Sequence, residues 1–82
     1  MAAANEIGYN DQIEVMARSL HVQTEVLGKI DLTVKTVVVE RGTILHVATT
    51  DVDTGASIEA IRAIAESQHR ATIDRVLGQE IV

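Results

Sequence analysis

Three histidines and several carboxylates are the side chains of this chain with the chemistry to bind a metal ion or to carry a proton. His21, His46 and His69 would form a zinc site only if the fold brought all three within reach of one ion. Glu66 and His69 have the i, i+3 spacing at which a helix presents a carboxylate and an imidazole together. A metal site inside a helical bundle needs a second such pair and two further glutamates, so we predict no metal at these residues.

A second candidate is the segment 52–58. Its residues Asp53, Thr54, Gly55, Ala56 and Ser57 resemble the catalytic Asp-Thr-Gly-Ala-Ser box of retroviral-type aspartic proteases. In that family two such aspartates share a proton across a dimer axis. The resemblance implies a flap hairpin and a second apolar-apolar-Gly segment after the box, whereas the chain that follows has a helical pattern. We therefore interpret the segment as a turn and a helix N-cap.

Asp51 and Asp53 also resemble the nucleophile loop of haloacid-dehalogenase-type phosphatases, in which one aspartate attacks phosphorus and the second acts as acid and base. That family requires a parallel sheet with crossover helices in a larger domain. A calcium loop fails as well, because no glutamate follows at the twelfth position. With no nucleophile elbow and no glycine-rich phosphate loop, we predict a protein without enzymatic activity, cofactor or metal.

The composition argues against several classes of partner. The 82 residues carry a net charge of −5 and include only Lys29 and Lys35 as lysines, whereas nucleic-acid binding needs clustered basic side chains. Tyr9 is the sole aromatic residue and there is no cysteine, so the chain lacks a base-stacking platform and disulfides. No apolar run approaches the roughly 20 residues that span a bilayer. We expect a location in the cytoplasm, or within a particle assembled there.

Three regions are expected before the hairpin. Residues 1–9 have no periodic pattern and are predicted to be a flexible arm. Asn10 or Asp11 can cap a short helix that ends near Leu20, with Glu14 placed as in a capping box. The apolar positions of this predicted helix have helical spacing: Ile13, Met16, Ala17 and Leu20. Residues 22–27 then alternate as a strand, and Gly28 marks a bend or turn.

The segment 33–49 predicts a β-hairpin with apolar residues on both faces. Strands over 30–40 and 43–50 would meet at the two-residue turn Arg41-Gly42, giving an antiparallel sheet of two or three strands. This turn places Val39 opposite Ile44, Val38 opposite Leu45, Val37 opposite His46 and Thr36 opposite Val47. A sheet with one face in water shows alternation, whereas the run Val37-Val38-Val39 indicates that both faces are covered.

The last element is the clearest. From about Ser57 to Leu77 the pattern predicts an amphipathic helix that Gly78 ends, followed by a tail over 79–82 in which Ile81 and Val82 could join an interface. His69 falls at the edge of the apolar stripe. The apolar stripe itself is Ile58, Ile61, Ile64, Ala65, Ala71, Thr72 and Val76. The fold class is therefore α+β, with one small domain over 10–78.

These features favour a structural or assembly subunit that binds copies of itself, as in a phage-like or other multi-copy particle. A chain this short buries only roughly 60% of its unfolded surface, and self-association would add burial. The alternative is a small acidic adaptor, chaperone or antitoxin-like inhibitor that binds one protein. The predicted interface consists of Val37, Val39, Ile44, Leu45, Ile58, Ile61, Ile64 and Val76.

Overall fold

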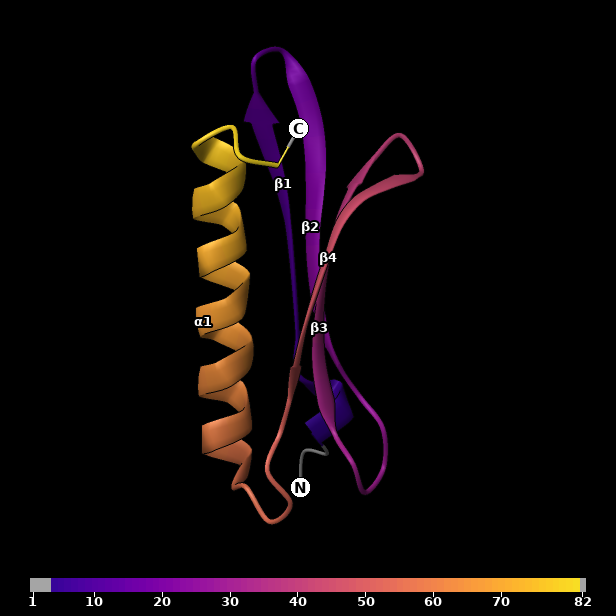
Figure 1. Ribbon diagram of the computed structural model, residues 1–82, viewed down its shortest axis with the longest axis vertical. Coiled ribbons are helices and arrows are strands. Elements are labelled where there is room, and N and C mark those ends of the chain that lie inside the picture. The colour runs from indigo at the N-terminus through magenta and orange to yellow at the C-terminus, as the bar shows by residue number, and fades with distance from the viewer. Residues whose placement is uncertain (1–3, 82) are drawn as a thin grey trace.

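The fold is a four-stranded antiparallel sheet with one helix packed on one of its faces (Figure 1). The computed structural model describes residues 4–81. The strands follow one another in space as they do in sequence, β1-β2-β3-β4. This arrangement confirms the α+β class. The elements are a 3₁₀ helix η1 (Ala4–Glu6), β1 (Gly8–Val15), β2 (Arg18–Leu27), β3 (Thr33–Glu40), β4 (Thr43–Asp51) and α1 (Ile58–Leu77).

The helix predicted over residues 10–20 is wrong, because this segment forms the β1–β2 hairpin. Met16 and Ala17 form the turn between the strands, and both have positive φ angles, 52° and 62°. Two positive φ angles define the type I′ turn, whose twist matches that of paired strands. Ile13 and Leu20 lie opposite each other in the hairpin. Their spacing of seven residues in the sequence therefore results from pairing across a turn, not from two turns of a helix.

Within the described residues, the end of the predicted N-terminal arm is part of the folded domain. Ile7 is buried, and Gly8 and Tyr9 belong to β1. Residues 1–3 of the predicted arm lie outside the described residues. The strand β1 is therefore an additional fourth strand that the prediction of two or three strands did not contain.

The β3–β4 hairpin has the predicted turn but a different register. Arg41 and Gly42 have φ angles of 49° and 81°, and Val39 lies opposite Ile44 as expected. A bulge at Leu45 then shifts the ladder by one residue, which pairs Val38 with His46, Val37 with Val47 and Thr36 with Ala48. The pairings predicted beyond Ile44 are therefore wrong. The shift places Val47 on the same face as Val37, because opposite residues share a face.

The core lies between the sheet and α1. Alternate side chains of the two central strands point at the helix, and all of them are buried: Leu20, Val22, Thr24 and Val26 from β2, and Val34, Thr36 and Val38 from β3. The helix contributes Ile61, Ala65, His69, Thr72 and Val76. One apolar cluster forms around Val34 and Ile61, and a second forms around Val38 and Val76.

The ends of α1 follow the sequence signals. The Ser57 hydroxyl accepts a hydrogen bond from the Ala60 N–H at 3.1 Å, which makes Ser57 the N-cap. Beyond the C-cap Gly78, Gln79 has a φ of 61°, and the Glu80 N–H donates to the Arg75 carbonyl at 2.9 Å. This bond, together with the one from Gln79 to Val76, forms a Schellman motif that turns the chain back. Ile81 is consequently buried in the second cluster.

Candidate functional site

The segment with two aspartates forms a turn before α1. The Thr33 hydroxyl donates to Asp51 at 3.3 Å, and the Asp53 carbonyl accepts a hydrogen bond from the Ala56 N–H at 3.1 Å. Gly55 has a φ of 89°, which suits the tight turn that leads to the N-cap. The sheet that precedes this turn is antiparallel throughout and therefore lacks the parallel order of the phosphatase family.

The three histidines lie in three different environments. His21 is exposed on β2, on the face opposite α1. His46 is half-buried on β4 and lies opposite Val38, whereas the predicted partner was Val37. His69 is buried on α1, and Glu66 forms an ion pair with Arg70 at 2.9 Å. Within residues 4–81, no three histidine or carboxylate side chains gather closely enough to hold a metal ion.

His69 was predicted at the edge of the apolar stripe of the helix. In the structure it lies at the centre of a buried polar network. Its side chain Nδ1 is 2.7 Å from the Thr24 hydroxyl, and its Nε2 is 2.7 Å from Asp11 Oδ2. The Thr24 and Thr36 hydroxyls are 2.6 Å apart. The Tyr9 ring packs beside the imidazole, with the ring centroids 5.5 Å apart. The network therefore joins β1, β2 and β3 to α1.

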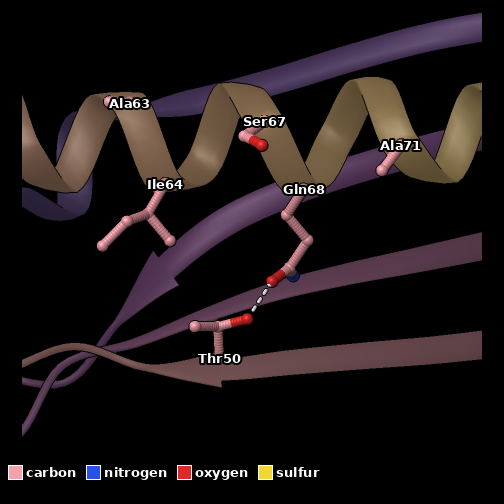
Figure 2. Close-up of a pocket in the computed structure, with 6 residues that line it drawn as sticks. All are labelled: Thr50, Ala63, Ile64, Ser67, Gln68 and Ala71. Carbon is pink, nitrogen blue, oxygen red and sulfur yellow. Dashed lines mark hydrogen bonds between the residues drawn. The ribbon is translucent and has the colours of Figure 1, made fainter.

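Gln68 extends this network to β4. Its amide nitrogen donates to the Thr36 hydroxyl at 3.0 Å and to the carbonyls of Val34 and Ala48, both at 3.2 Å. Its amide oxygen accepts a hydrogen bond from the Thr50 hydroxyl, as drawn in Figure 2. One helix residue therefore contacts both strands of the β3–β4 hairpin.

The side chains of the network form one continuous series of hydrogen bonds from Gln68 to Asp11. Because Gln68 donates to Thr36, the Thr36 hydroxyl proton is free to donate to Thr24. The Thr24 hydroxyl is also hydrogen-bonded to Nδ1 of His69, and Nε2 of His69 is hydrogen-bonded to Asp11. Within residues 4–81, no buried side-chain nitrogen or oxygen atom lacks a hydrogen-bond partner.

The order carboxylate, imidazole, hydroxyl is one that activates a nucleophile in hydrolases. Here the hydroxyl belongs to Thr24, which is only 3% exposed, and it is shared between Thr36 and His69. A substrate cannot reach it. The network instead binds the helix to the sheet between the two apolar clusters. The signal in the sequence was the pair Thr24 and Thr36, which occupy buried positions in two otherwise valine-rich strand faces.

The eight residues predicted to form an interface fall into three groups. Ile61 and Val76 are buried in this chain's own core and cannot contact a partner. Leu45, Ile58 and Ile64 are partly buried against the two clusters. Val37, Val39 and Ile44 lie on the face of the sheet opposite α1. The structure thus brings only the last three together on an open surface.

That open surface contains one further residue that the sequence analysis missed. Val47 lies opposite Val37 and is 47% exposed, while Ile44 is 59% exposed. We call the four side chains on this face, Val37, Val39, Ile44 and Val47, the hairpin patch. The neighbouring strand β2 is polar on the same face, where it carries Ser19, His21, Gln23 and Glu25. Val47 belongs to the patch because the bulge at Leu45 shifts the register and pairs Val47 with Val37. The alternation of apolar residues in the sequence does not indicate this bulge.

A shallow groove runs between α1 and β4 on the other face. It encloses about 500 Å³ and is lined by Thr50, Ala63, Ile64, Ser67, Gln68 and Ala71. Figure 2 shows Gln68 reaching from the helix across the groove to Thr50. Small side chains on α1 leave β4 less covered by the helix than the other strands.

An ion pair lies near the turn end of the sheet. Arg18 donates from Nε and Nη2 to the two carboxylate oxygens of Glu40, at 2.8 and 2.6 Å. These hydrogen bonds, with the attraction between the charges, hold the pKa of Glu40 below its usual value and raise the pKa of Arg18. The two charges therefore compensate each other on the α1 face of the sheet, whereas the charged residues nearest to the hairpin patch on its own face are Lys35 and Glu25, which lie opposite each other.

Comparison with known proteins found no matching family model, no similar curated protein and no similar solved structure. Within residues 4–81, no helix combines the length and the apolar character that a membrane crossing requires.

Proposed function

We propose that this protein is a non-enzymatic assembly subunit whose copies associate through the β3–β4 hairpin. The observation that carries this proposal is the hairpin patch. Helix α1 covers one face of the sheet, and no element within residues 4–81 covers Val37, Val39, Ile44 and Val47 on the other. Burial of apolar surface is worth roughly 25 cal/mol per Å², so contact between two such patches is favourable.

A second copy is the partner that fits this patch best. Both molecules carry a net charge of −5, so their association requires a surface without negative charge, and the patch provides one. A two-fold axis next to the patch would bring the apolar side chains of the two hairpins beside each other, as in most homodimers. The charges on the same face next to the patch, Lys35 and Glu25, lie opposite each other and have opposite signs.

The test is the mass of the protein in solution. Sedimentation equilibrium should give a dimer or larger species for the natural chain. The variant Val37→Lys/Ile44→Lys should shift it towards the monomer, since two desolvated ammonium groups oppose burial. The matched control is Ile30→Lys/Leu77→Lys, which changes two exposed apolar residues outside the patch and adds the same charge. This control should associate like the natural chain.

A monomeric natural chain at concentrations near 100 μM, in the range where weak dimers form, would contradict the proposal. Equal association of the patch variant and the control would contradict the use of the patch. A monomer that binds one foreign protein through the patch would instead support the acidic adaptor.

A further inference from the structure

The two edges of the sheet differ in how they are protected. β1, at one edge, contains the carboxylates Asp11 and Glu14. β4, at the other edge, contains no charged residue, proline or glycine between Thr43 and Thr50. Natural sheets usually guard their edges with charges or proline, because an unpaired strand pairs readily with another chain. Residues 46–50 of the β4 edge lack charges and proline, and the bulge at Leu45 lies before this segment.

The backbone groups of β4 that face outward can be identified. The Val52 N–H donates to the Leu32 carbonyl, and Gln68 contacts the carbonyls of Val34 and Ala48 together in the gap between β3 and β4. Along an antiparallel ladder, residue pairs that are hydrogen-bonded alternate with pairs that are not. Because Val52 and Leu32 form a hydrogen-bonded pair, Ala48 and Thr36, four positions further along the ladder, form one as well. The N–H and C=O groups of Val47 and Thr49 therefore point away from the sheet.

This segment is complementary to itself. The bulge at Leu45 limits the regular edge to residues 46–50, and Ala48 is its centre. A two-fold axis at Ala48 pairs Val47 of each copy with Thr49 of the other, which joins the outward N–H and C=O groups in four hydrogen bonds. The small Ala48 side chains meet at the axis. Each Asp51 lies beyond the paired segment, so no carboxylates oppose each other.

The groove on the helix side lies next to the β4 edge at which the incoming strand pairs. Pairing around Ala48 brings His46 of one copy beside Thr50 of the other, at the groove that Gln68 and Ser67 line. On the opposite face, Val47 of each copy extends the apolar surface of the hairpin patch across the axis. The same contact therefore fits both faces of the sheet.

We propose that two copies join edge to edge through β4, forming one continuous eight-stranded sheet with Ala48 at the two-fold axis. This inference rests on the proposed self-association and assigns the strand that mediates it. It predicts main-chain pairing at Val47 and Thr49, which contact between hairpin patches alone does not require.

Amide hydrogen exchange of the natural chain tests the pairing directly. At concentrations where the protein associates, the amide protons of Val47 and Thr49 should exchange at least about tenfold more slowly than under dilute, monomeric conditions. Outward amides of β1, such as Gln12, should exchange equally fast under both conditions. Unprotected Val47 and Thr49 amides in the associated protein would overturn the proposal.

A proline variant gives a second measurement. Thr49→Pro removes one outward N–H but no bond to β3, and edge positions tolerate proline. It should raise the dissociation constant at least about tenfold, whereas the control Gln12→Pro on the opposite edge should not. If Val37→Lys/Ile44→Lys dissociates the protein while Thr49→Pro does not, the edge pairing is wrong and the assembly function stands. A natural chain that stays monomeric overturns both.

Discussion

Thr24, Thr36 and His69 show that single buried polar residues can organise a small core. Each makes at least two contacts whose donors and acceptors match, and none leaves a buried side-chain atom unpaired within the described residues. A hydrogen bond that is kept adds little net stability, but a buried group that loses its partner is expensive. The network therefore fixes which face of α1 meets the sheet.

Replacement of Thr24 by valine tests this role. The change keeps the shape of the side chain but removes the hydroxyl that is hydrogen-bonded to both Nδ1 of His69 and the Thr36 hydroxyl. The free energy of unfolding, measured with urea, should fall by about 1–3 kcal/mol. Thr49→Val makes the same chemical change at an exposed position of β4 and should alter stability by less than about 0.5 kcal/mol. Equal effects of the two variants would show that the network contributes nothing.

Among the elements, α1 was predictable and the first hairpin was not. The helix shows one periodic stripe over many turns, and Ser57 and Gly78 mark its ends. In the first hairpin, the turn at Met16-Ala17 lacks glycine and asparagine, so no residue indicates a turn there, and Ile13 and Leu20 match a helical spacing. A short stripe is ambiguous because a two-residue turn also places apolar residues at such separations.

The candidate site was predictable in part. Val37, Val39 and Ile44 follow from strand alternation and the Arg41-Gly42 turn. Val47 did not, because a bulge depends on tertiary packing: the extra residue Leu45 turns towards the second core cluster. His69 was misplaced because a lone histidine among apolar helix positions does not reveal the hydroxyl of Thr24 on a distant strand.

The first turn also allows a test of its strain. Met16 and Ala17 both adopt the left-handed region, which is unfavourable for residues other than glycine, asparagine and aspartate. Met16 is 73% exposed, so its replacement removes little packing. Met16→Asn/Ala17→Gly should raise the free energy of unfolding by about 1 kcal/mol in a urea titration. Met16→Leu keeps the unfavourable φ and should change little. A less stable Asn-Gly variant would contradict the type I′ turn.

At the scale of the whole molecule, apolar and charged surfaces are separated. Most exposed charges lie on α1, on β1 and in the loops; Glu25 and Lys35 lie on the strands beside the hairpin patch, whereas the patch itself and residues 43–50 of β4 contain no Asp, Glu, Lys or Arg. A chain with a net charge of −5 is repelled by its own copies at long range and attracted by them only through contact at the hairpin. Self-association and binding to a basic partner should therefore respond to salt in opposite ways.

This difference gives the prediction for the assembled protein. Between about 10 and 300 mM NaCl the screening length falls from roughly 30 Å to below 10 Å, which removes the repulsion between the copies. The self-association constant from sedimentation should therefore rise several-fold with salt, while binding to a cationic partner would weaken. In Glu14→Gln/Asp53→Asn, the net charge changes from −5 to −3 at two exposed positions outside the hairpin. Because repulsion between the copies is smaller, this variant should associate more tightly at low salt and depend less on NaCl. A salt dependence that is unchanged by the two substitutions would mean that charge does not govern the assembly.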